Sequence, residues 1–214
     1  MVDAASADRL RLVQWLSPAF PIGAFAWSQG LETAIVDGDV TDAASLHSWI
    51  AAVLTHGTGR ADAILLAQAR ATDDLSALQD LALALAPCAE RAAETMEQGT
   101  AFARTIAALT GEETASLAYP LAVGRATRAL QVTTEEVLTL WLQGLAATLV
   151  SVGVRFIPLG QTDGQRVLAG LTDRIVALAA ELEKAPLSAL SSSTPRADLA
   201  AMRHETLQTR IYRS

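Results

Sequence analysis

The sequence predicts an all-α protein, on three observations. Its residues are 51% hydrophobic but only 5% aromatic, a composition that favours packed helices over sheets, which prefer β-branched and aromatic side chains. Apolar residues recur at intervals of three and four in several segments, the spacing of one buried helix face. No two alternating runs are joined by an Asn-Gly or Asp-Gly turn, so hairpins are not indicated. We therefore expect a single-domain bundle of roughly eight to ten helices.

The first element follows a stiff, apolar stretch at 17–32, SPAFPIGAFAWSQGLE. Pro18 and Pro21 hold this chain extended, and three aromatic side chains anchor it by burial. Ser28 is then expected to cap the N-terminus of a helix QGLETAIVD. Gly30 lies in the first turn of that helix, where glycine is less favourable than alanine by roughly 1 kcal/mol. A glycine at this position indicates that another backbone comes close.

Later helices are predicted by their caps and their apolar stripes. TDAASL at 41 and TTEEVL at 133 each place an N-capping side chain and acids ahead of an apolar run. The stripes are Leu46, Trp49, Ile50, Val53 and Leu54, then Phe102, Ile106 and Leu109, then Leu168, Leu171, Ile175, Leu178 and Leu182. Glycines at 38, 111 and 160 are expected to end helices.

One segment, residues 137–154, imitates a membrane span because it has 18 residues without a charge. Polar residues interrupt it, however, and no basic flank marks a cytoplasmic side. A helix that is apolar all round is also typical of the centre of a soluble bundle, which is our interpretation. Cys88 is the only cysteine, so no internal disulfide forms, and the N-terminus does not read as a secretory signal. A cytoplasmic protein is therefore expected.

Only the run APLSALSSSTPRAD has the composition of a linker. The predicted organisation is a flexible N-terminus (1–8), a helical bundle (9–185), a Ser/Pro linker (186–196) and a C-terminal helix with a partner-binding tail (197–214). The tail mixes arginines with aliphatic and aromatic residues, as binding surfaces do. We expect it to be disordered or loosely docked until a partner binds; the alternative is a solvated chain end.

Several function classes are excluded or weak. The net charge of −7 makes nucleic-acid binding improbable, because phosphate backbones require a basic surface. A P-loop requires a lysine after its glycines, and the only lysine, Lys184, has no glycine nearby. The histidines His47, His56 and His204 have no metal-ligand spacing. We therefore assign no catalytic residue, no metal ligand and no cofactor.

A serine hydrolase is the alternative from a different class. AWSQG around Ser28 is similar to the nucleophile elbow G-x-S-x-G with its first glycine replaced, and His204 lies downstream. The elbow needs a strand that feeds a strained turn, and the chain supplies no strands. This alternative is therefore the weaker one.

Four motifs resemble the UreF family of urease accessory proteins. They are LSPAFPIGAFAWSQGLETAI near the start, GRADAILLA at 59–67, RFIPLGQTDGQRVL at 155–168 and DLAAMRHETLQTRIYRS at the end. The likeness runs in order from about Leu10 to Ser214 and is weak over 73–117. Arg155 departs from the lysine usual in the family, so a lysine-specific role is in doubt.

The resemblance implies an all-α homodimer that is not an enzyme; the net charge and the interpretation of 137–154 give the expectation that it binds neither nucleic acid nor a membrane. The resemblance also implies a chaperone that helps to load nickel into the urease active site. In this role the protein bridges UreD (also called UreH), which sits on apo-urease, to the GTPase UreG, which delivers the nickel. Gln29, Gly30, Glu32 and Arg155 are the candidate residues for the GTPase side. Arg203, His204, Glu205, Arg210, Tyr212 and Arg213 are the candidates for the UreD side. Whether nickel passes through this protein or beside it stays open.

Overall fold

A computed structural model describes residues 3–111 and 115–213, and the regular elements in those ranges are helical. The all-α prediction is confirmed. The α-helices are α1 (Ala4–Trp15), α2 (Leu31–Val36), α3 (Ala43–His56), α4 (Thr58–Ala71), α5 (Ser76–Ala84), α6 (Ala89–Thr110), α7 (Tyr119–Thr127), α8 (Thr134–Phe156), α9 (Gln161–Gly170), α10 (Thr172–Leu182) and α11 (Pro195–His204). Two short 3₁₀ helices, η1 (Ala24–Ala26) and η2 (Leu187–Ala189), complete them.

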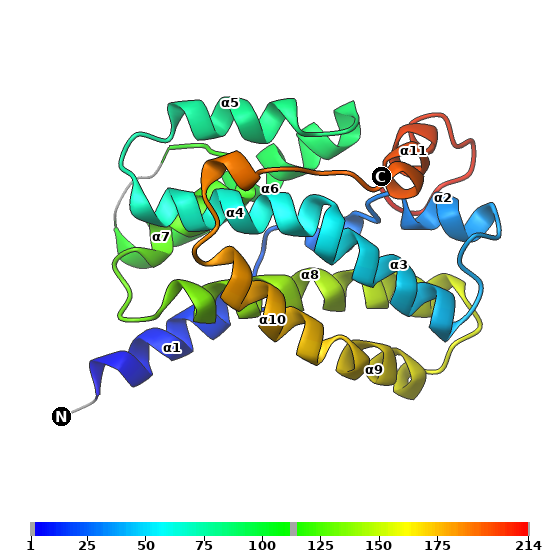
Figure 1. Ribbon diagram of the computed structural model, residues 1–214, viewed down its shortest axis with the longest axis horizontal. Coiled ribbons are helices and arrows are strands. Elements are labelled where there is room, and N and C mark those ends of the chain that lie inside the picture. The colour runs from blue at the N-terminus through cyan, green and yellow to red at the C-terminus, as the bar shows by residue number, and fades with distance from the viewer. Residues whose placement is uncertain (1–2, 112–114, 214) are drawn as a thin grey trace.

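The helix α8 lies at the centre of the bundle (Figure 1). It packs against α2, α3, α4, α9 and α10, and it buries Leu138, Leu142 and Leu149 almost completely. By length and composition α8 could cross a membrane, but half of its apolar window is buried inside the protein. The position agrees with our interpretation of 137–154 as a central bundle helix.

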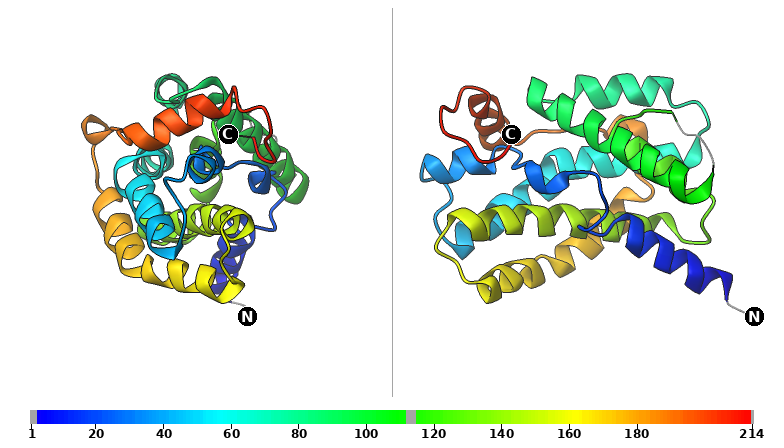
Figure 2. Two further views of the ribbon diagram at one scale, coloured as in Figure 1. Left: turned by 90° about the vertical axis from the view of Figure 1, so that its right-hand side faces the viewer. Right: turned by 180° about the vertical axis from the view of Figure 1, so that it is seen from behind.

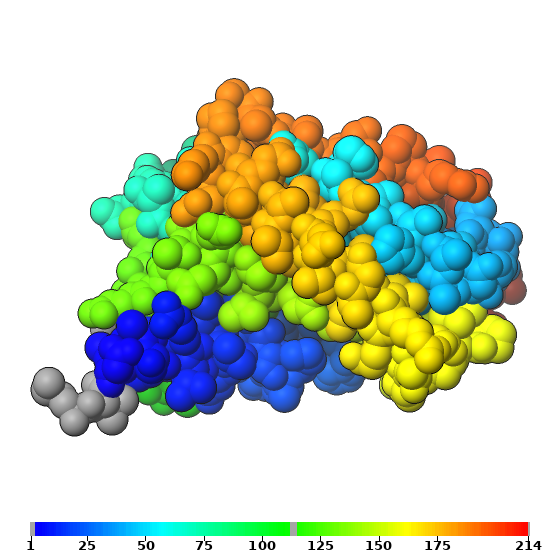
Figure 3. All heavy atoms as spheres, turned by 60° about the horizontal axis from the view of Figure 1, so that its bottom comes forward, coloured from blue at the N-terminus to red at the C-terminus, as the bar shows by residue number. Residues whose placement is uncertain are grey.

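The other helices surround α8 in an elongated bundle, seen from two further sides in Figure 2. α6 and α7 pack on each other, and α7 also packs on α4. α9 and α10, separated only by Leu171, form a diagonal ridge on the face shown in Figure 3, with α1 at one corner. At the opposite end of the molecule from α1, α11 lies beside α2 (Figure 1).

The predicted helix caps are present. The Asp42 carboxylate accepts a hydrogen bond from the amide of Ser45, and the Ser45 hydroxyl accepts one from the amide of Asp42, which makes a capping box. Thr133 and Glu136 make the same arrangement at the start of α8. Gly111 ends α6 in the left-handed conformation, with φ 78°. The prediction that Gly160 ends a helix is wrong, because Gly160 is the N-cap that precedes α9.

Two further predictions need correction. Leu109, expected on a buried stripe, is 55% exposed. The last buried residue of α6 is Ile106, and the apolar periodicity of a helix does not show how far along it the neighbouring helices extend. The second concerns the expected flexible N-terminus, 1–8: residues 1 and 2 lie outside the described residues, and from Ala4 the chain is helical. The buried carboxylate of Asp8 accepts a hydrogen bond from the amide of Gln131 at 2.8 Å, which ties α1 to the start of α8.

Candidate functional site

The C-terminal segment folds back onto α2, the helix that follows the SPAFPIGAFAWSQGLE stretch. The Ser/Pro run does not separate it from the bundle, since the amide of Ser193 donates to the carbonyl of His56 at 2.7 Å. Gly30 has φ 80°, and a Cβ on it would lie 2.5 Å from the backbone nitrogen of Ala201. The prediction that another backbone approaches Gly30 is confirmed, and that backbone is α11 of the same chain.

Glu32 is the centre of this contact. The side chain of Glu32 is 2% exposed and accepts three hydrogen bonds: from His204 Nε2 at 2.9 Å, and from the amides of Ile211 and Tyr212 at 2.8 and 3.0 Å. Three donors on one buried carboxylate leave it little capacity for an external partner. The interpretation of Glu32 as a charge on a docking surface is therefore wrong.

His204 extends the network to a third helix. The ring is fully buried, and Nδ1 lies 2.9 Å from Oε2 of Glu90 in α6. The two ring nitrogens therefore bridge the carboxyl groups of Glu32 and Glu90. Arg210 also donates to Glu90, at 2.5 Å. Burial opposes the shift, but the hydrogen bonds with His204 and Arg210 together lower the pKa of the Glu90 carboxyl. The network joins α2, α6 and α11 to the tail.

Arg213 fixes the other end of the tail. Its amide donates to the carbonyl of Ala26 at 2.7 Å, and its carbonyl accepts from the amide of Ser28 at 2.9 Å. Its guanidinium lies 4.1 Å from the centroid of the Trp27 ring and pairs in two places with Glu97. The hydrogen bond from Arg213 lowers the pKa of Glu97. The last described residue is thus held by backbone, aromatic and ionic contacts.

Tyr212 brings the second sequence motif into the same region. Its ring is 5.6 Å from that of Phe156 and 5.7 Å from the guanidinium carbon of Arg155, and burial raises the pKa of its hydroxyl. Arg155 therefore lies on the ring of Tyr212, although we expect Arg155 on the GTPase side and Tyr212 on the UreD side. The expectation of a disordered or loosely docked tail is wrong for the part of the tail that the structure describes.

The structure thus merges the two predicted residue sets into one region. Arg155, Arg203, Glu205, Arg210 and Arg213 are exposed, while Gly30, Glu32, His204 and Tyr212 are buried beneath them. Gln29 is partly buried, and its amide donates to Glu94 at 3.1 Å. We call the exposed set the tail face. Beside it a groove of about 760 Å³ is lined in part by Val36, Phe156 and Ile211.

All four buried residues were candidates in the sequence, but local patterns could not show that they are buried or that they lie together. Glu32 and His204 are 172 residues apart, and each occurs in a sequence that suits an exposed helix end. The glycine at position 30 was the one local signal, because it required a close backbone without saying which one.

The serine hydrolase alternative fails on the geometry. Ser28 is fully buried and does not cap a helix, since α2 begins at Leu31 with Gly30 as its N-cap. Its hydroxyl has no hydrogen-bond partner among the described residues, and the ring of His204 is hydrogen-bonded to Glu32 and Glu90. Among the described side chains, no group of three or more His, Cys, Asp or Glu could hold a metal ion.

Fold and site together define an all-α protein whose distinctive polar residues hold a C-terminal segment in place. Comparison with known proteins is consistent with this class. The UreF family model matches residues 40–172. A urease accessory protein UreF of Cereibacter sphaeroides is 58% identical over 209 residues, which cover 98% of this chain and 100% of that protein. One of Paracoccus denitrificans is 54% identical over 97% of both chains.

The chain belongs to the UreF family of urease accessory proteins. A third relative, from Dinoroseobacter shibae, is 48% identical over 97% of this chain. By this membership the chain is an accessory protein and not an enzyme. The family resemblance stated from the four motifs is confirmed over the whole chain.

Proposed function

We propose that this chain is a cytoplasmic scaffold for nickel insertion into urease. In this function it bridges UreD (UreH), seated on apo-urease, to the GTPase UreG, and it acts as a homodimer. It does so by assembly and not by chemistry, so that the metal moves between proteins held in a fixed arrangement.

One observation carries the proposal: the tail face presents four charged side chains on an anchored C-terminal segment, with Arg155 of α8 beside them. A segment that is already ordered loses little conformational entropy when a partner binds it. Exposed charges at the edge of an interface act on the rate and specificity of association more than on folding. These properties suit a surface that recognises other proteins.

We assign the exposed residues of the tail, Arg203, Glu205, Arg210 and Arg213, to the UreD side. Gln29 and Arg155 are assigned to the GTPase side. His204 and Tyr212 contribute to the UreD side by anchoring the tail. Gly30 and Glu32 contribute to the GTPase side by fixing the start of α2 against α11 and the tail. The two sides adjoin, so one partner touches residues next to those of the other.

Co-purification with UreD, UreG and apo-urease tests this function. Arg155→Glu should reduce UreG recovery, and Arg203→Glu should reduce UreD recovery, with the melting temperature unchanged. Arg166→Glu is the matched control, because Arg166 is an exposed arginine on α9 paired only with Asp163 three residues before it. Full recovery of both partners by both tail-face variants would contradict the assignment.

The homodimer is tested separately by light scattering. Leu10 and Val13 lie three residues apart on α1 and are 72% and 53% exposed, and Phe25 is 77% exposed. Such side chains supply the apolar contact that a stable dimer requires. A monomer at tens of micromolar would count against the dimer and leave the partner assignments untouched.

A further inference from the structure

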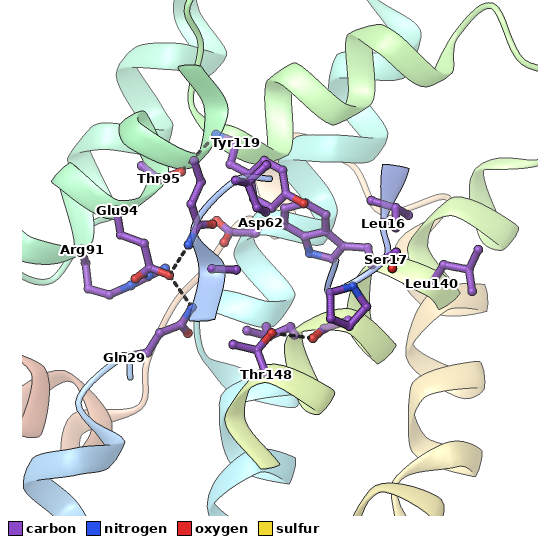
Figure 4. A pocket seen from close by; sticks show the side chains of 17 residues that line it. Leu16, Ser17, Gln29, Asp62, Arg91, Glu94, Thr95, Tyr119, Leu140 and Thr148 are labelled. Carbon is purple, nitrogen blue, oxygen red and sulfur yellow. Dashed lines mark hydrogen bonds and ion pairs between the residues drawn. The ribbon is translucent and has the colours of Figure 1, made fainter. Parts of the chain in front are cut away.

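A cavity of about 70 Å³ lies among α4, α6, α7, α8 and the stretch that precedes α2 (Figure 4). One part of its wall is apolar, with Leu16, Ile22, Leu140 and Leu145. The rest is polar and includes ionisable side chains from α4 and α6. This combination is typical of a site that encloses a small ligand and orients it.

The polar wall is centred on Glu94, whose side chain is 2% exposed. Its Oε1 accepts from the amides of Gln98 and Gln29 at 2.9 and 3.1 Å, and its Oε2 pairs with Nη1 of Arg91 (Figure 4). Three donors satisfy this carboxylate from within the chain, so Glu94 forms a wall and has little capacity for a ligand.

Two other polar groups on the wall are not satisfied in this way. Arg91 and Trp141 are 6% and 7% exposed, and Nε of Arg91 and Nε1 of Trp141 have no hydrogen-bond partner within the described chain. A buried donor without an acceptor costs about 1–3 kcal/mol. Both residues line the cavity, so a molecule inside it is the available acceptor.

The charges on the wall restrict what that molecule is. A bare cation would face the N–H groups of Arg91 and Trp141. An anion would face Glu94 and also Asp62, whose pKa is raised to about 6 by burial and which is therefore mostly ionised at pH 7.5. A neutral molecule with both lone pairs and polar hydrogens can accept from the two donors and donate to Asp62.

We propose that this cavity binds small neutral hydrogen-bonding molecules, with ordered water as the resident and small amides as solutes of the same chemistry. A water molecule occupies about 30 Å³ in the liquid, so the cavity has room for roughly two. Acetamide, with four non-hydrogen atoms, presents a carbonyl acceptor and an amide donor and is small enough to replace them. Buried waters of this kind typically make about three hydrogen bonds to groups that would otherwise be unpaired.

The test uses nuclear magnetic resonance of the ¹⁵N-labelled full chain at pH 7.5. We expect cross-peaks from long-lived water to Nε–H of Arg91 and Nε1–H of Trp141, and shifts of both signals on titration with acetamide. Trp49 is the internal control, because its indole nitrogen is also buried with no partner in the part of the chain that the structure describes, and Trp49 does not line this cavity. Nickel chloride and sodium phosphate, added separately, should leave the signals of Arg91 and Trp141 in place.

Gly144→Ala is the matched variant. Gly144 lines the cavity, and a Cβ there would lie 3.5 Å from the carbonyl oxygen of Leu16, an ordinary contact. The added methyl group should weaken the water cross-peaks and the acetamide response, with the melting temperature little changed. Trp141→Phe should remove one donor and leave the water cross-peak at Arg91, which serves if Gly144→Ala fails to fold.

Water cross-peaks without an acetamide response support the proposal with water as the ligand. A dry cavity, shown by no water contact at either donor, overturns it. Larger shifts with nickel or phosphate than with acetamide also overturn it, since the site would then select charge.

Discussion

The three hydrogen bonds to Glu32 predict that Glu32→Ala releases the C-terminal tail. The substitution leaves the buried His204 ring nitrogen and the buried Tyr212 amide without their acceptor, while the Ile211 amide can turn to water. Each buried polar group left without its partner costs about 1–3 kcal/mol. For the two groups together we take about 4 kcal/mol, the middle of the summed range, as the loss at this contact.

Amide hydrogen exchange measures this loss directly. A loss of 4 kcal/mol corresponds to about a thousandfold faster exchange at Tyr212 and Arg213, whose amides donate to Glu32 and to the carbonyl of Ala26. If the tail leaves as a unit, the amides of the central helix α8 should keep their protection, because local opening need not involve the rest of a domain.

The control is Asp37→Ala. Asp37 pairs with Arg203 at 3.3 Å on the surface, with side chains 43% and 67% exposed, and exposed pairs contribute about 0–1 kcal/mol. Exchange at Tyr212 should then change less than about fivefold. Exchange in Glu32→Ala within tenfold of the wild type would refute the reasoning and show that other contacts hold the tail.

Three more predictions concern stability, measured by chemical denaturation. Gly30→Ala forces a Cβ against Ala201 and a left-handed backbone at a non-glycine residue, so we expect a loss of about 2 kcal/mol or more; an unchanged midpoint would contradict the close packing of α11. Burial raises the pKa of Asp62 to about 6 from 3.8, so the native state binds a proton more tightly than the unfolded chain does. The contribution of Asp62 to the free energy of unfolding therefore falls as pH rises from about 4 to 6. Asp62→Asn should have the same stability as the wild type near pH 4 and be more stable by up to about 3 kcal/mol above pH 6. Arg70→Met should lose about 2–4 kcal/mol, because Arg70 donates to two carbonyl groups and one hydroxyl in the turn between α7 and α8, whereas Arg60→Met, which breaks an ion pair with an exposed glutamate, should lose under about 1 kcal/mol.

Much of the fold could be predicted from local chemistry. The capping boxes at Asp42 and Thr133 and the apolar stripe of α3 depend on residues within one or two turns, and these predictions agree with the structure. Periodicity did not reveal where a stripe stops being covered, as Leu109 shows. It also did not predict that α1 would begin before residue 8, because helix propensity is weak in a polar segment until a tertiary contact such as that of Asp8 stabilises it.

The candidate site was predictable only in part. Gly30 and the arginine-rich tail were both identified from the sequence, but as features of two separate surfaces. Their union depends on the pairing of Glu32 with His204, and no sequence periodicity links residues so far apart. The cavity was not predicted at all, because a donor such as Nε1 of Trp141 is left unpaired by the surrounding packing and not by its neighbours in sequence.

The long separation between Glu32 and its partners also sets an order of events during protein synthesis. Tyr212 follows Glu32 by 180 residues, and ribosomes add about 5–20 residues each second. Glu32 is therefore synthesised on the order of 10 to 40 seconds before the donors that surround its carboxylate in the folded chain. During that time α2 lacks its covering segment, so the growing chain exposes a charged and partly apolar surface that a ribosome-associated chaperone could bind.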